Sequence, residues 1–163
     1  AIINSEYVWL VGAGATILQT SDGGETWRAG SVGVPNIRFT ATSFVDERHG
    51  WAVGSEGSVF ATTNGGRTWR AQESNVRADL FDVKFFDRME GWAVGAAGTM
   101  LHTTDGGARW ATEPSVTTHS LERLYFSDPE RGWAVGFGGT ILAFGPANSA
   151  PKKAPGLKNR SLR

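Results

Sequence analysis

A short motif returns four times along this chain at an almost constant interval. Each copy contains a tryptophan, one further apolar residue, a valine and a glycine in that order. The tryptophans are Trp9, Trp51, Trp92 and Trp133, so successive copies lie 42, 41 and 41 residues apart. A fixed period of about 20–50 residues is typical of folds in which each repeat forms one supersecondary unit. The chain is therefore expected to build its core by stacking similar units.

A second motif, Thr-x-Asp/Asn-Gly-Gly-x-x-Trp, follows the first three copies, and we call it the Asp box. Its acidic or amide side chain can accept backbone hydrogen bonds and fix the turn, while the glycines supply positive φ angles. The expected structural positions are Asp22 and Trp27, Asn64 and Trp69, and Asp105 and Trp110. All seven tryptophans fall on these two repeat positions. We therefore expect them to be buried packing anchors and not ligand-stacking residues.

Each unit divides into four short apolar or β-branched segments separated by glycine-rich turns. Four antiparallel strands at this period indicate an all-β chain of β-propeller blades. The units lie near residues 1–30, 31–72, 73–113 and 114–145. The first unit lacks most of its innermost strand and the fourth has no Asp box, which leaves about three and a half blades. Residues 146–163 have no core-forming pattern, and we expect an extended basic tail.

Composition excludes several classes of function. All 16 acidic residues precede the last thirteen positions, which carry five of the 16 basic residues, and the formal net charge is zero. This balance does not favour nucleic-acid binding. The chain has no cysteine, and neither metal-ligand spacing nor a cofactor motif is visible. No apolar run approaches the roughly 20 residues of a membrane span. Because the chain opens in mid-repeat at Ala1, we expect a processed, trimmed or incomplete N-terminus.

The combined motif, Gly-Trp-Ala-Val-Gly followed by the Asp box, resembles the repeat of the photosystem II stability/assembly factor family, a branch of the BNR or Asp-box propellers. The resemblance covers residues 1–145. It implies a seven-bladed propeller in the thylakoid lumen or periplasm that binds protein subunits of a photosynthetic reaction centre. The chain carries about half of such a ring, and a half ring has exposed blade faces. We therefore expect it to dimerise, to pack against a partner, to close as a small four-bladed ring or to be a fragment.

A non-catalytic binding surface is the preferred function. In a propeller, the loops that lead into the inner strands share one face with the corners between second and third strands. Here that face is where the repeats differ from one another. We predict partner-binding roles for Arg38, Arg77, Arg123, Phe137 and Glu56. We expect the three arginines to form a basic patch near the channel mouth, because arginine suits partner recognition, and Phe137 is a candidate apolar anchor. The alternative for each arginine is a solvated surface charge.

Catalysis is disfavoured by the spacing of the candidate groups. Asp-box glycosidases need an arginine cluster and a tyrosine nucleophile, but the chain has only Tyr7 and Tyr125. Residues 34–38 resemble the Arg-Ile-Pro signature of these glycosidases only faintly, and in the wrong order. The three histidines fall at unrelated repeat positions, and the box carboxylates lie on different blades, so they cannot converge as catalytic pairs must. We therefore expect no enzyme, and an Asp-box glycosidase or a carbohydrate-binding module stays the less favoured alternative.

Two partner-binding classes remain open at this point. One is a transient assembly or stability factor, and the other is a permanent accessory subunit of a membrane complex. Either would be extracytoplasmic and attached to the membrane through its partners. The basic tail either docks on an acidic partner or anionic lipid surface, or is a solubilising end.

Overall fold

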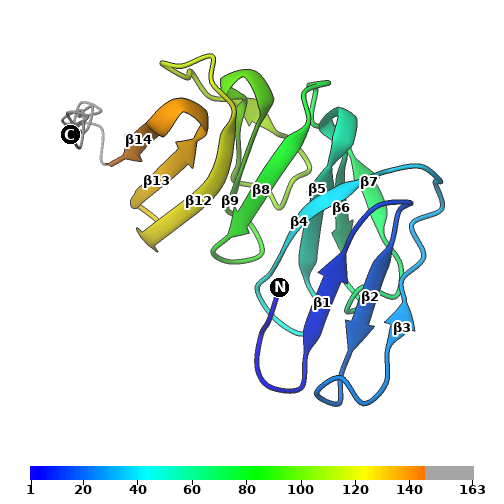
Figure 1. Ribbon diagram of the computed structural model, residues 1–163. Coiled ribbons are helices and arrows are strands. Elements are labelled where there is room, and N and C mark those ends of the chain that lie inside the picture. The colour runs from blue at the N-terminus through cyan, green and yellow to red at the C-terminus, as the bar shows by residue number, and fades with distance from the viewer. Residues whose placement is uncertain (146–163) are drawn as a thin grey trace, which may run out of the picture.

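The computed structural model describes residues 1–145, which form four antiparallel sheets in chain order (Figure 1). The first sheet contains β1 (Val8–Val11), β2 (Ile17–Thr20) and β3 (Arg28–Ala29). The second contains β4 (Phe39–Phe44), β5 (Gly50–Gly54), β6 (Val59–Thr62) and β7 (Arg70–Gln72). The third contains β8 (Leu80–Phe85), β9 (Gly91–Gly95), β10 (Met100–Thr103) and β11 (Ala111–Thr112). The fourth contains β12 (Leu121–Asp128), β13 (Arg131–Gly136) and β14 (Thr140–Phe144).

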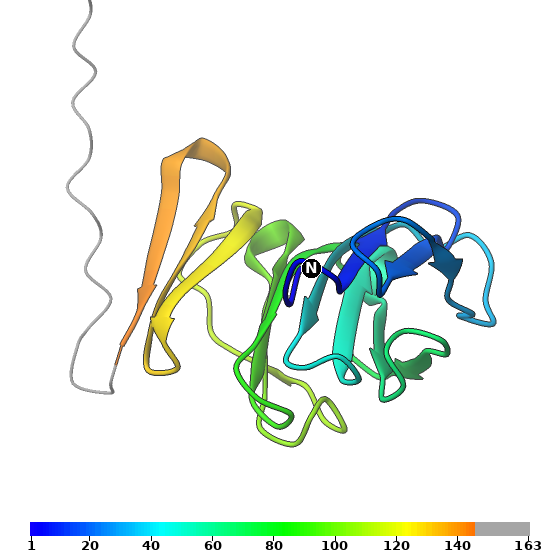
Figure 2. The ribbon, with the colours of Figure 1, turned by 90° about the horizontal axis from the view of Figure 1, so that it is seen from below.

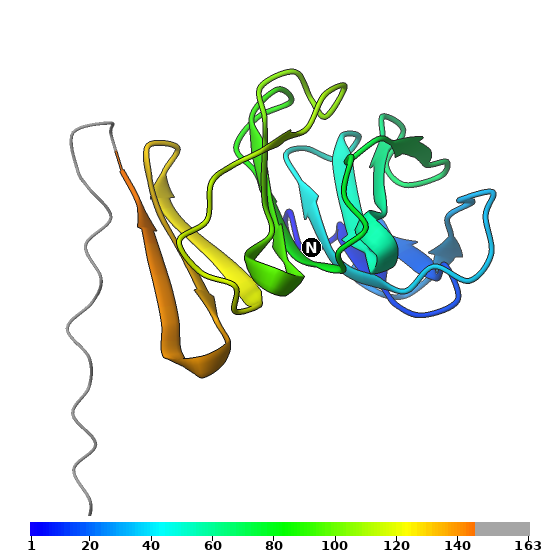
Figure 3. The same cartoon turned by 90° about the horizontal axis from the view of Figure 1, so that it is seen from above.

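Each sheet is a meander whose spatial order follows the sequence. Three short 3₁₀ corners join second and third strands, namely η1 (Ser55–Gly57), η2 (Ala96–Gly98) and η3 (Phe137–Gly139). Figures 2 and 3 show the sheets side by side as an open arc. The all-β prediction of about three and a half propeller blades is confirmed. No helix within residues 1–145 has the length and apolar character needed to cross a membrane.

The two terminal blades are each incomplete on one side. In blade one, β2 pairs with one edge of β1, and only residues 1–3 run along the other edge. There the Ala1 amino group donates to the Trp9 carbonyl oxygen at 2.9 Å, and Ile2 forms a bridge with Val8. In blade four β14 pairs with β13, and no described strand pairs with its other edge. The predicted basic tail, residues 146–163, lies outside the described residues.

The inner strands β4, β8 and β12 are joined by hydrogen bonds between blades. The Thr40 hydroxyl donates to the Leu80 carbonyl oxygen at 2.6 Å, and the Phe85 amide donates to Ser43 Oγ at 3.0 Å. The Leu124 amide donates to Asp82 Oδ2 at 2.8 Å, although burial raises the pKa of Asp82. Side chains of one inner strand thus pair polar backbone groups of the next, as burial requires.

An aromatic ladder holds successive blades together. Trp51 of blade two stacks on Phe85 of blade three with ring centroids 3.5 Å apart, and the edge of Trp110 meets the same phenylalanine at 5.7 Å. The Trp51 indole Nε1 donates to the Gly106 carbonyl oxygen at 2.9 Å in the Asp box of blade three. The corresponding group one blade earlier is Trp9, Phe44 and Trp69. Trp9 and Trp51 therefore pack against a phenylalanine of the following blade, whereas Trp69 and Trp110 meet the same ring from their own blade.

This arrangement corrects the expectation that all seven tryptophans are buried anchors. Trp27 is 41% exposed and Trp133 is 42% exposed. Trp133 occupies the same repeat position as buried Trp51, but no blade follows it among the described residues. Trp27 has no inner-strand phenylalanine in its own sheet to pack against. Burial at these positions therefore depends on whether an inner-strand phenylalanine, from the following blade or from the same blade, lies against the indole, and not on the motif alone.

Candidate partner-binding face

The corners and the loops leading into the inner strands share one face of the chain, which we call the corner face. Backbone hydrogen bonds join each corner to its loop: Ser55 donates to the Arg38 carbonyl at 3.0 Å, and Ala96 donates to that of Asp79 at 2.8 Å. Phe137 donates to the Ser120 carbonyl at 2.9 Å in the same way. The three corners lie along the upper edge of the sheets in Figure 1. Loops 35–38, 76–79 and 117–120 are thereby held beside them.

The corners have a tight left-handed geometry. Glu56, Ala97 and Gly138 occupy equivalent positions with φ of 55°, 52° and 68°. Gly138, and not Phe137, is therefore the counterpart of Glu56, which refines the expectation for these corners. The next residue in η1, Gly57, also has positive φ, and an added Cβ there would collide with the Val76 carbonyl. Glycine thus allows the loop into blade three to cross directly over η1.

Arg38 and Glu56 meet around Asp79 on this face. The Arg38 guanidinium lies 3.1 Å from Asp79 Oδ2, and the Glu56 amide donates to Asp79 Oδ1 at 2.9 Å. Asp79 was not among the predicted site residues. Asp79 lies one repeat after Arg38 in the sequence. Opposite charges at equivalent positions of successive repeats were therefore the sequence signal for this ion pair between blades two and three. The pair is largely exposed and so contributes at most about 1 kcal/mol.

Arg77 and Arg123 do not join this cluster. Both are exposed, and neither forms an ion pair with any residue in 1–145. The Arg123 guanidinium donates to the neighbouring Glu122 carbonyl oxygen. A shared basic patch of Arg38, Arg77 and Arg123 stays a prediction.

Phe137 is the most prominent apolar side chain of the corner face. It begins η3 and is 71% exposed. Its ring meets that of His119 edge-on at 6.4 Å, and His119 Nδ1 lies 2.9 Å from Thr140 Oγ1. Sequence reasoning gave His119 no role, because the histidines show no repeat pattern. Exposed aromatic rings of this kind are common anchors at protein interfaces.

The opposite face carries the Asp boxes, and its geometry is repetitive. In box one Thr20 Oγ1 accepts from the Gly24 amide at 2.9 Å and donates to Asp22 Oδ1 at 2.7 Å. Asp22 also accepts from the hydroxyl and amide of Thr26, and these bonds lower the pKa of Asp22 to about 2. The bond from the Arg109 amide lowers the pKa of Asp105 in box three. These carboxylates are engaged within their own turns.

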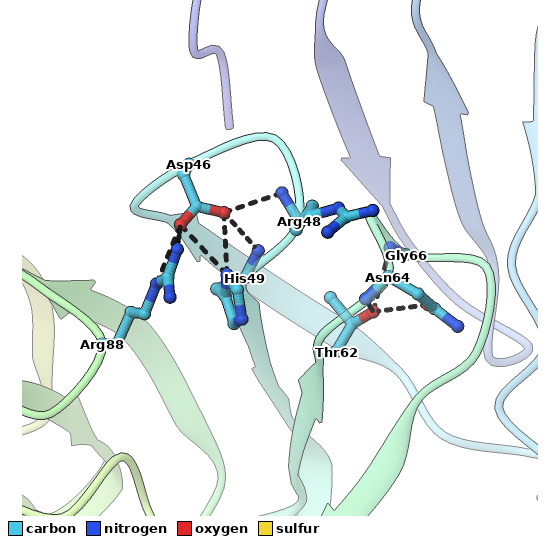
Figure 4. Close-up of polar contacts among 7 residues, drawn as sticks. All are labelled: Asp46, Arg48, His49, Thr62, Asn64, Gly66 and Arg88. Atoms are coloured by element: carbon cyan, nitrogen blue, oxygen red, sulfur yellow. Dashed lines mark hydrogen bonds and ion pairs between the residues drawn. The ribbon is translucent and has the colours of Figure 1, made fainter.

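Figure 4 shows box two beside a second anchor on the same face, the turn that begins at Asp46. Asn64 replaces aspartate and accepts from the Thr68 amide at 3.1 Å. Asp46 accepts from the Arg48 and His49 amides, both at 2.8 Å, and pairs with Arg88 of blade three at 3.0 Å. Burial alone would raise the pKa of Asp46, but these hydrogen bonds together lower it. Asp46 thus links neighbouring blades on the Asp-box face, a role not foreseen from the sequence.

The groups considered for catalysis lie apart. Tyr7 stacks near Trp9 in blade one, at 6.2 Å between ring centroids. Tyr125 is exposed on blade four, opposite Trp133 in the strand pairing. Across residues 1–145 no three His, Cys, Asp or Glu side chains are grouped closely enough to hold a metal ion.

The sequence matches the family described as photosynthesis system II assembly factor YCF48. The matches span residues 1–71, 32–114 and 72–145, and thus include every blade. The chain belongs to this family. Its repeats are accordingly YCF48-type blades, as the resemblance predicted. No curated protein matches the chain.

Solved structures of YCF48 proteins have the same fold. One, described as YCF48 bound to D1 peptide, aligns with a TM-score of 0.77 and 24% identity over 98% of this chain and 53% of its own. YCF48 from Cyanidioschyzon merolae aligns with a TM-score of 0.69 and 22% identity over 88% of this chain and 52% of its own. The chain therefore spans about half the length of these relatives.

A more distant propeller also aligns with these YCF48-type blades. The GH74 xyloglucanase from Xanthomonas campestris has a TM-score of 0.67 and 17% identity over 84% of this chain and 25% of its own. At this identity the likeness concerns the fold alone, because one fold supports many functions.

Proposed function

We propose that this protein is a non-catalytic assembly factor that binds a subunit of a photosynthetic reaction centre through its corner face. Membership of the YCF48 family is the observation that carries the proposal. One similar solved structure is described as a YCF48 protein bound to D1 peptide, which supports an extended segment of such a subunit as the ligand.

The distribution of repeated and unrepeated side chains favours the corner face as the binding surface. On the Asp-box face, polar side chains such as those of Asp22 and Asn64 form hydrogen bonds within their own turns. The corner face instead presents the exposed ring of Phe137 and the charged cluster of Arg38, Glu56 and Asp79. Apolar anchors and fixed charges on one face suit recognition of a partner protein. The proposed location is the periplasm or thylakoid lumen, with membrane attachment through the bound subunit.

The test is co-isolation of the tagged 163-residue chain with subunits from solubilised photosynthetic membranes, quantified by mass spectrometry. Arg38→Glu should reduce recovery of the bound subunit by about tenfold, the equivalent of about 1.4 kcal/mol. Arg67→Glu is the matched control, because Arg67 is also exposed but lies in the Asp box of blade two. Recovery should then stay within about twofold of the unmodified chain.

The possible results separate the remaining alternatives. Equal losses in the two variants would remove the corner face from the proposal. Absence of any reaction-centre subunit would overturn the proposed partner. Recovery in a fixed one-to-one ratio with mature complexes would identify an accessory subunit in place of an assembly factor.

A further inference from the structure

Blade four departs from the other blades where its Asp box should be. By the repeat spacing, positions 144–151 correspond to box three at 103–110, but they read Phe-Gly-Pro-Ala-Asn-Ser-Ala-Pro. Phenylalanine replaces the threonine, proline replaces the aspartate, and a second proline replaces the tryptophan. The local bonds that fix the other three turns therefore cannot form with these residues.

The complete blades define what normally occupies this place. In blade three, β11 pairs with the outer edge of β10, and Trp110 packs against Phe85. The Gly106 carbonyl of the same segment accepts from the Trp51 indole. Blade two repeats the arrangement, with the Gly65 carbonyl 2.8 Å from Trp9 Nε1. The occupant is in each case a box turn that supplies the carbonyl, followed by an aromatic ring and then by a short strand.

Within residues 1–145, blade four has the surface that receives such a segment but not the segment itself. Trp92 is the counterpart of Trp9 and Trp51, and its Nε1 is buried with no acceptor among residues 1–145. Its ring lies 6.4 Å from Phe126, compared with 3.5 Å for the stacked pair Trp51 and Phe85. A buried donor without a partner costs about 1–3 kcal/mol, so an added acceptor would be favourable.

A largely apolar groove lies at the same place. It encloses about 450 Å³ and is lined by residues that include Trp92, Val116, Phe126, Leu142 and Phe144. Its β14 side is the edge that lacks a neighbouring strand in the described chain. The groove thus combines an open sheet edge, an apolar lining and a buried donor.

We propose that this groove binds a segment of a partner protein in the place that the box turn and the fourth strand occupy in blades two and three. The segment pairs with the β14 edge, offers a backbone carbonyl to Trp92 Nε1 and places an aromatic or large apolar side chain against Phe126. Strand addition of this kind gains affinity from main-chain bonds and specificity from side-chain pockets. The inference rests on the proposed function only in taking a protein as the partner, since Arg38, Asp79 and Phe137 do not line the groove.

A partner protein is favoured over this chain as the source of the strand. The outer strands β3, β7 and β11 are already paired within their own sheets, so a second copy has no described Asp-box strand to donate. Residues 146–163 contain no aromatic residue, and Pro146 and Pro151 stand at the positions of the box aspartate and tryptophan.

The probe is a synthetic peptide with the sequence of residues 103–113, the segment that fills the equivalent place in blade three. Its binding to the ¹⁵N-labelled 163-residue chain is followed by NMR of the indole groups, with the Trp92 signal assigned from Trp92→Phe. We expect a saturable shift of that signal. A peptide in which the residue equivalent to Trp110 is alanine should bind about tenfold more weakly, because it lacks the aromatic contact.

Two variants locate the binding. Val116→Lys places a charge in the groove at a side chain that is 76% exposed, so folding should be retained while peptide affinity falls about tenfold. Val34→Lys, at an exposed valine outside the groove, should bind the peptide unchanged. An unmoved Trp92 signal, or equal losses in both variants, would overturn the proposal. A Trp92 shift that follows protein concentration without peptide would assign the groove to a second copy and overturn it too. None of these results tests whether a reaction-centre subunit is recovered through the corner face, so this proposal and the proposed function can fail independently.

Discussion

At the scale of single residues, the Asp boxes provide an internal comparison between carboxylate and amide. Asp22 accepts from the Thr26 amide at 2.9 Å, and Asn64 accepts from the Thr68 amide at 3.1 Å in the equivalent turn. The folded-state pKa of Asp22 is about 2, below the ordinary value of 3.8. The contribution of Asp22 to stability is therefore complete above pH 4 and is lost as the pH falls toward 2.

We expect this difference to appear in amide proton shifts measured between pH 5 and pH 2. The Thr26 amide should titrate as Asp22 takes up a proton, whereas the Thr68 amide should not, because the Asn64 side chain does not ionise in this range. Asp22→Asn should abolish the titration of Thr26 and is the control. Parallel titration of the Thr26 and Thr68 amides would show a response to acid that extends over both blades and is not confined to the Asp22 box.

At the scale of elements, the aromatic ladder predicts unequal costs at one repeat position. Trp51 is 4% exposed between two blades, whereas Trp133 is 42% exposed on the last sheet. Trp51→Ala should lower the free energy of unfolding by about 3–5 kcal/mol, because it removes a buried ring and leaves a cavity. Trp133→Ala should cost only about 1–2 kcal/mol, since less of the ring is buried. Urea unfolding of both variants measures the difference, and equal costs would mean that Trp133 is covered in solution.

The crossing of a loop over η1 gives a second comparison between matched sites. Gly57 and Gly33 have φ of 69° and 76°, so alanine meets similar backbone strain at both positions. An added Cβ at Gly33 has nothing within 4 Å, but at Gly57 it collides with the Val76 carbonyl. We expect Gly33→Ala to cost about 1 kcal/mol and Gly57→Ala about 3 kcal/mol in urea unfolding. Similar losses would indicate that the loop moves aside without cost.

At the scale of the whole molecule, one face of blade four exposes several large side chains. Tyr125, Trp133 and Ile141 are all exposed large side chains on paired strands of one sheet. Exposed apolar patches of this kind favour contact with other apolar surfaces. The isolated 163-residue chain should therefore associate with rising concentration in analytical ultracentrifugation, and Ile141→Lys should abolish that association. A monomer at every concentration would contradict the prediction, and Leu10→Lys on blade one tests whether the opposite end contributes.

The repeat spacing was sufficient to predict the local structure. It identified the blades, the incomplete first and fourth sheets and the box turns, because short-range patterns of glycine, threonine and apolar residues dictate hairpins directly. The pairing of Arg38 with Asp79 was also encoded, at equivalent positions one repeat apart, but it was not recognised. The predicted grouping of Arg38 with Arg77 and Arg123 still awaits a test.

Only the tertiary structure decided which repeated residues are buried and which lack partners. Trp51, Trp92 and Trp133 share one motif, yet the first is buried and hydrogen-bonded, the second is a donor without an acceptor among residues 1–145, and the third is exposed. The physical reason is that the environment of each indole is supplied by the following blade. A sequence motif determines the residue and its strand, whereas burial and hydrogen-bond partners belong to the pair of blades that meet.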